Sequence, residues 1–245
     1  MPLVILNGIR GGVGATSTTI TLARQLTLQK KKVIIIDNCI ENILYCYLSG
    51  EKKQTTLSQA LLKETPIQEA IFDYQSHLQI LPFGVVDQKD SLLLQSSLSV
   101  KQNVDNFLSH FIQHNPDTII LMDLQYSQYQ DTIFSSWLEK ADILLTITMA
   151  ESNCHIRLNQ HKFSANEYVL INQFRATSQV QQDFRQYWQT TSLPLCPIVL
   201  HQDEASLEAC ASQLPLYDYR SNCMLVEEIN QLTQWCLALL IRKEG

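Results

Sequence analysis

The sequence lacks the features that mark secreted, membrane-spanning or redox-active proteins. Its seven cysteines include no Cys-x-x-Cys pair and are scattered along the chain, a pattern typical of reduced, mostly buried thiols. No apolar run approaches the roughly 20 residues of a membrane span, and no signal-peptide pattern precedes the first apolar run. We therefore expect a cytoplasmic protein.

An excess of positive charge is also missing. Lys and Arg total 18 against 24 Asp and Glu, so the formal net charge is −6. Broad affinity for nucleic acid requires a basic surface that neutralises phosphates, so we expect no nucleic-acid partner. Internal repeats and low-complexity linkers are absent as well. The 245 residues, 45% of them hydrophobic, are enough for one large core, and we predict a single nucleotide-binding domain over residues 1–245.

Glycine is scarce, yet four of the seven glycines lie in one stretch, LVILNGIRGGVGATSTT at residues 3–19. This stretch predicts a buried strand, a glycine-rich turn and the start of a helix, an arrangement in which backbone N–H groups approach an anion closely. The helix N-terminus adds partial positive charge, and Thr16 and Ser17 supply hydroxyl groups. The sequence therefore predicts a phosphate-binding loop.

Two kinds of nucleotide loop fit this stretch. The spacing of Gly8, Gly12 and Gly14, with Asp37 closing the next apolar run, fits the dinucleotide loop of a dehydrogenase. The alternative is a P-loop, G-x-x-x-x-G-K-[ST], in which Ala15 occupies the lysine position. The dehydrogenase interpretation also needs a tyrosine followed four residues later by lysine, and none of the nine tyrosines meets this condition. We therefore favour a nucleoside triphosphate.

Apolar runs of strand length alternate with helical segments along the chain. Because these runs do not alternate with polar residues, both faces of the sheet are expected to be covered, which predicts an α/β fold with a mostly parallel, twisted sheet and helices on both faces. The predicted strands cover residues 3–6, 33–36, 78–81, 119–122, 143–147, 169–171 and 198–200. A helix is predicted over residues 224–243, where docking on the core is favoured over a membrane-surface role.

Two acidic residues, Asp37 and Asp123, close predicted strands. The carboxyl ends of parallel strands border the crevice in which ligands bind. We therefore predict that both carboxylates take part in catalysis around Mg²⁺, Asp123 as the acid of a Walker B motif, with the Thr16 hydroxyl as a further metal ligand. For Asp37 the alternative is a helix-capping role.

Two further side chains are candidates for ligand contact. Asn172 follows another predicted strand, and its amide has both a donor and an acceptor for a purine edge, although an asparagine that turns the chain is an alternative. Arg157 lies in what we predict to be a loop after the strand that ends near Met149, where its guanidinium would supply the charge that Ala15 does not, or else form a surface salt bridge. Adjacent Cys154 and His155 have a poor spacing for a metal site.

Several segments together resemble the ParA/MinD group of deviant P-loop ATPases, the SIMIBI or MinD-like class, and within it the branch that belongs to bacterial cellulose-synthesis operons. The resemblance runs nearly end to end. It is carried by RGGVGATS from residue 10, D-x-C from 37, LPFG from 81, NCHIRL from 153, LINQFR from 170, HQDEA from 201 and P-x-x-x-YRS ending at 221. NCHIRL and YRS together are the most specific to that branch.

The resemblance implies an ATP- and Mg²⁺-binding site with two unusual positions. The signature lysine of the group, which crosses a dimer to the partner's nucleotide, corresponds to Arg10, and the water-positioning acid of the group corresponds to Cys39. Loss of the P-loop lysine at Ala15 removes an interaction on the order of 4 kcal/mol for charges ~4 Å apart. The remaining nucleotide contacts implied are backbone amides at Gly11, Gly12, Val13, Gly14 and Ala15, the hydroxyls of Thr16 and Ser17, and an adenine pocket at Asn172, His201 and Asp203.

From this resemblance we expect an ATP-bridged homodimer with slow or negligible hydrolysis that serves cellulose secretion. The implied partners are other products of the operon, namely a small BcsR-type protein, a BcsE-type cyclic-di-GMP regulator and the synthase. Recruitment to the inner membrane would be indirect. The alternatives are an active positioning ATPase, in which Glu41 or Asp203 replaces Cys39, and an NAD-dependent reductase.

Overall fold

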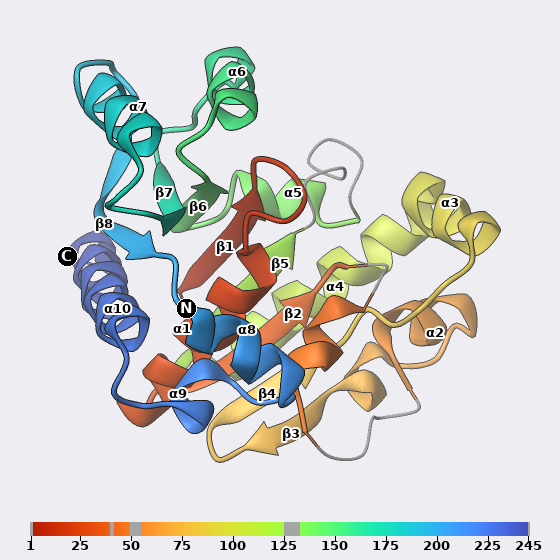
Figure 1. Ribbon diagram of the computed structural model, residues 1–245. Helices are drawn as coiled ribbons and strands as arrows, with labels where there is room; N and C mark the ends of the chain where they lie inside the picture. Colours follow the sequence, from red (N-terminus) through yellow and green to blue (C-terminus); the bar gives the residue numbers. More distant parts are fainter. Residues whose placement is uncertain (1, 40–41, 50–54, 125–132, 245) are drawn as a thin grey trace.

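A computed structural model describes residues 2–39, 42–49, 55–124 and 133–244 (Figure 1). Its centre is one sheet with the strand order β3-β4-β2-β5-β1-β6-β7-β8. Neighbouring strands are parallel except for β3, which pairs antiparallel with β4 at one edge. The predicted mostly parallel sheet is confirmed. The strands are β1 (Leu3–Gly8), β2 (Lys32–Asp37), β3 (Phe72–Gln75), β4 (Leu78–Leu81), β5 (Thr118–Leu124), β6 (Ile143–Thr148), β7 (Glu167–Phe174) and β8 (Leu195–His201).

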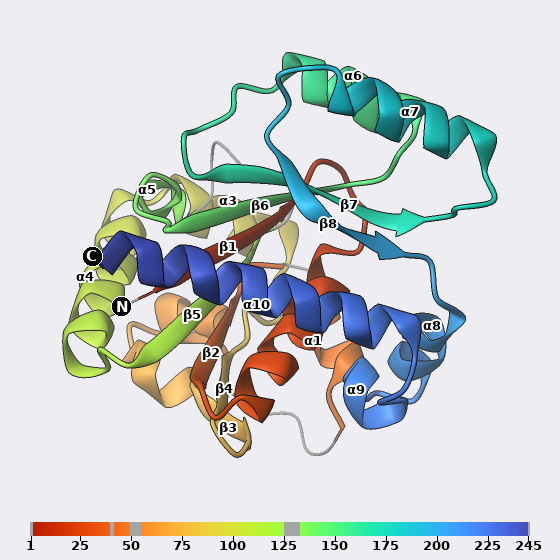
Figure 2. The same cartoon turned by 90° about the vertical axis from the view of Figure 1, so that its left-hand side faces the viewer.

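Helices cover both faces of this sheet, as predicted (Figure 2). Side chains of the central strands alternate between two cores: Val4 and Leu6 pack with residues of α1 and α10, whereas Leu3 and Ile5 pack with residues of α2 and α4. The helical elements are α1 (Ala15–Leu28), η1 (Ile43–Tyr47), α2 (Leu57–Leu62), η2 (Ile67–Ala70), α3 (Gln88–Ser96), α4 (Leu98–His114), α5 (Ser135–Leu138), α6 (Ser152–Gln160), α7 (Gln179–Gln189), α8 (Glu204–Ala211), α9 (Leu216–Tyr219) and α10 (Met224–Glu244).

All seven predicted strands are present, and each of the apolar runs lies within an observed strand. The prediction missed β3, which is a four-residue edge strand with a register shift and partly exposed side chains. An edge strand with one neighbour does not need apolar residues on both faces, so its sequence FDYQ carries none of the signal that marks the buried strands.

The strand order places the ends of four strands around one point. Strand β5 lies between β1 and β2, so the loop after β1 has the carboxyl end of β5 on one side and that of β6 on the other. In the dinucleotide-binding fold the first two strands are neighbours. The topology is therefore wrong for the dehydrogenase interpretation and leaves the triphosphate interpretation in place.

Helix α10 begins at Met224 and crosses the molecule against α1 and β8 (Figure 2). Leu232 and Cys236 on this helix are almost fully buried, whereas Ile241 is 70% exposed. The predicted docking of this segment on the core is confirmed. Among the described residues, no helix combines the length and the apolar composition that a membrane span requires.

This packing predicts the effect of truncating one side chain of α10. We expect Leu232→Ala to lower the free energy of unfolding by about 2–5 kcal/mol, because it removes a fully buried side chain and leaves a cavity. Urea unfolding followed by circular dichroism measures this change. Ile241→Ala on the same helix is the control and should change the value by less than about 0.5 kcal/mol. Equal losses for the two variants would contradict the docking.

Candidate nucleotide-binding site

The loop between β1 and α1 has a shape that only glycine allows at two of its positions. Gly12 and Gly14 have φ values of 78° and 88°, in the left-handed region. A Cβ atom on Gly14 would lie 2.4 Å from Nδ2 of Asn172, so this glycine is also required by close packing. The loop is therefore pressed against the end of β7.

Two amide side chains from β7 hold the loop by its carbonyl groups. Asn172 Nδ2 donates to the Val13 carbonyl at 2.8 Å, and Gln173 Nε2 donates to the Gly12 carbonyl at 3.1 Å. Asn172 was predicted to contact a purine; the structure places it below the loop, where its Oδ1 accepts the Gln173 backbone N–H. Gln173 was not predicted as a site residue. Its φ of 53° and its contact with the loop both depend on the folded structure, and neither can be recognised in the sequence.

Helix α1 begins at the loop without a capping side chain, since its N-cap is Gly14. The first-turn hydroxyls turn back along the helix instead: Ser17 Oγ and Thr18 Oγ1 donate to the Gly14 carbonyl at 3.0 and 2.7 Å. The N–H groups at the start of α1 are thus left without a side-chain acceptor, and together with the helix dipole they favour an anion at this point.

The loop borders a cavity of about 390 Å³. This size suits a small-molecule ligand. Most of the predicted contact residues line it together: Arg10, Gly11, Gly12, Val13, Gly14, Ala15, Thr16, Ser17, Asp123, Asn172, His201 and Asp203. Lining residues that the sequence did not single out include Tyr47 and Ser206. Among the described residues around the cavity, Arg10 is the only lysine or arginine.

The two predicted acids stand side by side. Asp37 and Asp123 are register partners on the parallel strands β2 and β5, and they are 0% and 2% exposed. Asp37 Oδ1 accepts the Cys39 backbone N–H at 2.9 Å, while Oδ2 of each residue is buried with no hydrogen-bond partner among the described residues. Asp123 faces the cavity; Asp37 lies behind it and does not line it.

Burial of these carboxylates changes their acidity. Burial raises the pKa of Asp123 to about 6, although a hydrogen bond with the Thr16 side chain opposes this. The pKa of Asp37 is raised well above its ordinary value, first by burial and then by the adjacent charge of Asp123. Two unpaired carboxylate oxygens beside a threonine hydroxyl form an oxygen donor set that suits Mg²⁺.

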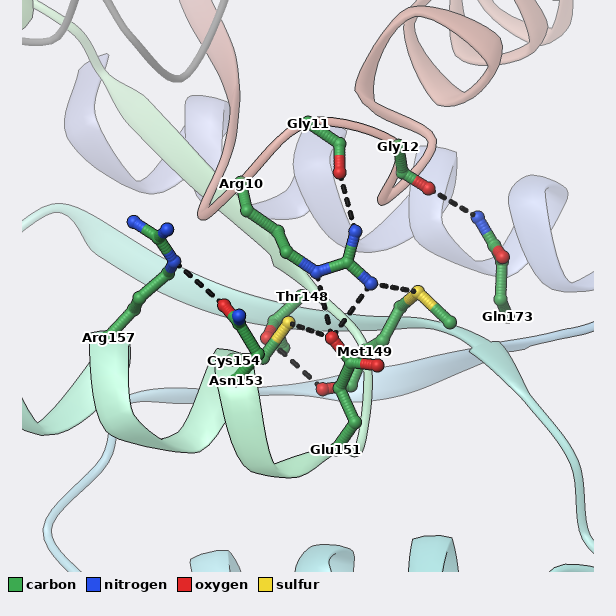
Figure 3. A network of polar contacts seen from close by, with 10 residues as sticks. All are labelled: Arg10, Gly11, Gly12, Thr148, Met149, Glu151, Asn153, Cys154, Arg157 and Gln173. Atoms are coloured by element: carbon green, nitrogen blue, oxygen red, sulfur yellow. Dashed lines mark hydrogen bonds and ion pairs between the residues drawn. The ribbon is translucent and has the colours of Figure 1, made fainter.

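Arg10 lies against its own chain (Figure 3). Its Nε and Nη2 lie 2.8 and 2.7 Å from Oε1 of Glu151, and its Nη1 donates to the Gly11 carbonyl at 2.6 Å. Nη2 also contacts Met149 Sδ at 3.3 Å. Glu151 is the residue before α6 and was not predicted.

The other end of the cavity is formed where β8 ends. His201 Nδ1 lies 2.5 Å from Glu228 Oε1 on α10, and Glu228 Oε2 accepts the His201 backbone N–H at 2.8 Å. Asp203 Oδ1 accepts the Ala205 N–H and so caps α8. Glu228 was missed because it reaches His201 only through the docking of α10.

The prediction for the segment around Arg157 was wrong. Residues 152–160 form α6, not a loop, and Arg157 Nε donates to Asn153 Oδ1 one turn earlier at 2.8 Å (Figure 3). Arg157 is not among the described residues that line the cavity. Cys154 and His155 are consecutive on this helix but have different partners. The Cys154 thiol contacts Glu151, and the His155 ring accepts a hydrogen bond from Trp188.

The sheet order and the loop define the class of protein. The structure superposes on a ParA family ATPase from Chlorobium tepidum with a TM-score of 0.75 at 17% identity, over 96% of this chain and 98% of that chain. It superposes on the septum site-determining protein MinD from Pyrococcus horikoshii, complexed with Mg-ADP, with a TM-score of 0.67 at 19% identity, over 94% and 93% of the two chains. The fold is that of the ParA/MinD P-loop NTPases.

Within that class the sequence comparisons are more specific. The family model for cellulose biosynthesis protein BcsQ matches residues 1–237. The BcsQ protein of Escherichia coli strain K12 is 34% identical over 241 residues, which cover 97% of this chain and 94% of that protein. The chain belongs to the BcsQ family of cellulose biosynthesis proteins.

The raised pKa of Asp123 predicts how stability changes with pH. The pKa of Asp123 in the folded protein, about 6, lies above its value of ~3.9 in an unfolded chain, so the folded state binds more protons between these values. Its contribution to the free energy of unfolding is therefore lost as pH rises through this window. We expect Asp123→Asn to gain on the order of 2 kcal/mol over the unsubstituted protein between pH 4 and pH 6.5.

Urea unfolding of the nucleotide-free, Mg²⁺-free protein across this pH range measures the difference. Asp117→Asn, which removes an exposed carboxylate, is the control and should follow the unsubstituted protein at every pH. A difference between Asp123→Asn and the unsubstituted protein that does not change with pH would contradict the assignment.

Proposed function

We propose that this BcsQ family protein binds ATP with Mg²⁺ in the cavity and forms a homodimer bridged by the nucleotide. The observation that supports this most is the shape of the loop, whose carbonyls at Gly12 and Val13 are held by β7. Fixing these carbonyls leaves the N–H groups of the loop and of α1 to meet a phosphate chain. The MinD relative described with Mg-ADP shares the fold.

The residues present fit a magnesium nucleotide. Thr16 and Asp123 would supply oxygen donors from the wall of the cavity, and Asp37, which lies directly behind Asp123, would add its negative charge. Burial leaves Oδ2 of each aspartate without a partner that a cation or a proton would provide. Mg²⁺ would neutralise part of the phosphate charge, a role that matters more here because Ala15 contributes no ammonium group. His201 and Asp203 are our candidates for the base end of the cavity, whereas the amide of Asn172 is bonded to the loop and would reach a base only by giving up the Val13 carbonyl.

Slow hydrolysis follows from the same residues. The P-loop lysine is replaced by Ala15 and the expected water-positioning acid by Cys39, which is 2% exposed beside the cavity. Of the two substitutes considered for Cys39, Glu41 lies outside the described residues and Asp203 caps α8. Charge stabilisation of this kind commonly accelerates phosphoryl transfer ~10³-fold or more. Binding depends on more contacts than turnover does, so binding is retained.

The protein would therefore act as a nucleotide-dependent structural component of cellulose secretion. Its proposed partners are a small BcsR-type protein, a BcsE-type cyclic-di-GMP regulator and the synthase. These partners would bring a cytoplasmic protein to the inner membrane. A second candidate function, an active positioning ATPase, shares the fold but requires a group that activates water.

The proposed nucleotide-bridged dimer predicts a change in oligomeric state. With ATP and Mg²⁺ the protein should shift from monomer to dimer in sedimentation velocity, and Arg10→Ala should weaken the dimer at least tenfold, because it removes the charge expected to reach the partner's phosphates. Lys63→Ala, which removes an exposed cation on another part of the surface, is the control. A dimer that forms equally well without nucleotide would count against the proposal.

The rate of phosphate release separates the two candidate functions. Phosphate release should be slower than about 10⁻² s⁻¹ for the isolated protein and should rise less than about tenfold when the proposed partners are added. Restoring both missing groups with Ala15→Lys and Cys39→Asp should raise the rate. Strong activation of the unsubstituted protein by its partners would favour the positioning ATPase.

A further inference from the structure

The guanidinium of Arg10 already has an anion within its own chain. Nε and Nη2 both lie within 2.8 Å of a single oxygen of Glu151, Oε1, and the Cys154 thiol lies 3.3 Å from that same oxygen. Figure 3 shows the guanidinium between the glycine-rich loop and the start of α6. All three of its nitrogens therefore have partners in one protomer, since Nη1 bonds the Gly11 carbonyl.

This arrangement conflicts with the role that the proposed dimer gives to Arg10. Four of the five N–H groups of this guanidinium are directed at Glu151, Gly11 and Met149, so it cannot make a paired contact with the phosphates of the partner's nucleotide until it leaves Glu151. Arg10 is the only cation among the described residues around the cavity, so no described neighbour replaces it. Dimer formation therefore requires Arg10 to exchange one anion for another.

We propose that Glu151 is a positioning residue that holds Arg10 against its own chain until the triphosphate of a partner subunit displaces it. This inference rests on the proposed function, since it assigns the regulation of the same site. A triphosphate carries more negative charge than one carboxylate and offers the guanidinium paired oxygens, so the exchange favours the dimer only when nucleotide is present. Without nucleotide, the Arg10–Glu151 ion pair opposes association.

The surroundings of Glu151 make this exchange feasible. Its side chain is 35% exposed, so departure of Arg10 leaves a carboxylate in contact with water. Glu151 occupies the N-cap position of α6, a nine-residue helix without a side-chain capping hydrogen bond, and the helix N-terminus favours a negative charge at that point. The Cys154 thiol keeps its contact with Oε1. Release of Arg10 therefore leaves no buried, unpaired charge.

The size of the effect follows from exposure and symmetry. The side chains of Arg10 and Glu151 are 25% and 35% exposed, and an ion pair of this kind changes an equilibrium ~threefold. A symmetric dimer breaks one such pair in each protomer. Removing the glutamate charge should therefore tighten the dimer about tenfold.

The experiment compares Glu151→Gln with the unsubstituted full-length chain in sedimentation velocity at saturating ATP and Mg²⁺. We expect the dimer dissociation constant of Glu151→Gln to fall about tenfold. Its affinity for ATP, measured by calorimetry at concentrations where the protein is monomeric, should stay within about twofold, because the ion pair opposes association and not nucleotide binding. Glu69→Gln, which removes an exposed carboxylate from η2, is the matched control and should change neither value.

Each outcome decides between the two proposals. If the unsubstituted protein dimerises with ATP but Glu151→Gln dimerises equally or less well, Glu151 does not restrain Arg10 and the proposed function stands. If the unsubstituted protein remains a monomer at saturating ATP, the proposed function fails and the restraint fails with it. A tighter dimer of Glu151→Gln that still requires ATP supports the restraint and the proposed function together.

Discussion

The site depends on two hydrogen bonds that cross from the end of β7 to the loop after β1. They orient the carbonyls of Gly12 and Val13 toward the sheet, and the loop N–H groups are left for a ligand. Close contact at Gly14 fixes the distance between loop and strand, since no larger residue fits against Asn172. Gln173, whose φ of 53° is in the left-handed region, supplies the second of these hydrogen bonds. The geometry of the loop between β1 and α1 is therefore set by the neighbouring strand β7 as much as by the glycines.

The buried carboxylates beside this loop explain why a bound nucleotide and metal would stabilise the fold. Asp37 and Asp123 are buried beside each other, and burial raises the pKa of both. Such carboxylates destabilise the folded state when they are ionised and unpaired. A ligand that brings a cation to them would remove this cost, so ligand binding and folding stability are linked. The absence of a lysine at Ala15 increases this dependence.

How much the sequence predicts depends on whether the signal is local. The seven buried strands are predictable because burial on both faces requires continuous apolar runs, whereas β3 at the edge does not need one. Helix α6 was missed because it starts after Glu151, which is not a residue type that usually caps a helix. The loop and its two acids are predictable because strand ends carry them. The Arg10–Glu151 and His201–Glu228 pairs are not, since each joins segments that are distant along the chain.

The fate of Arg10 connects these points to the proposed function. Under the proposed function, hydrolysis would be too slow to separate the dimer, and an equilibrium between two anions would make association reversible instead. When nucleotide leaves, Arg10 of each subunit would regain Glu151 of its own chain, and that gain would favour the monomers. Because the return depends on a partly exposed pair of modest strength, it adjusts the balance between monomer and dimer without preventing assembly when nucleotide is abundant.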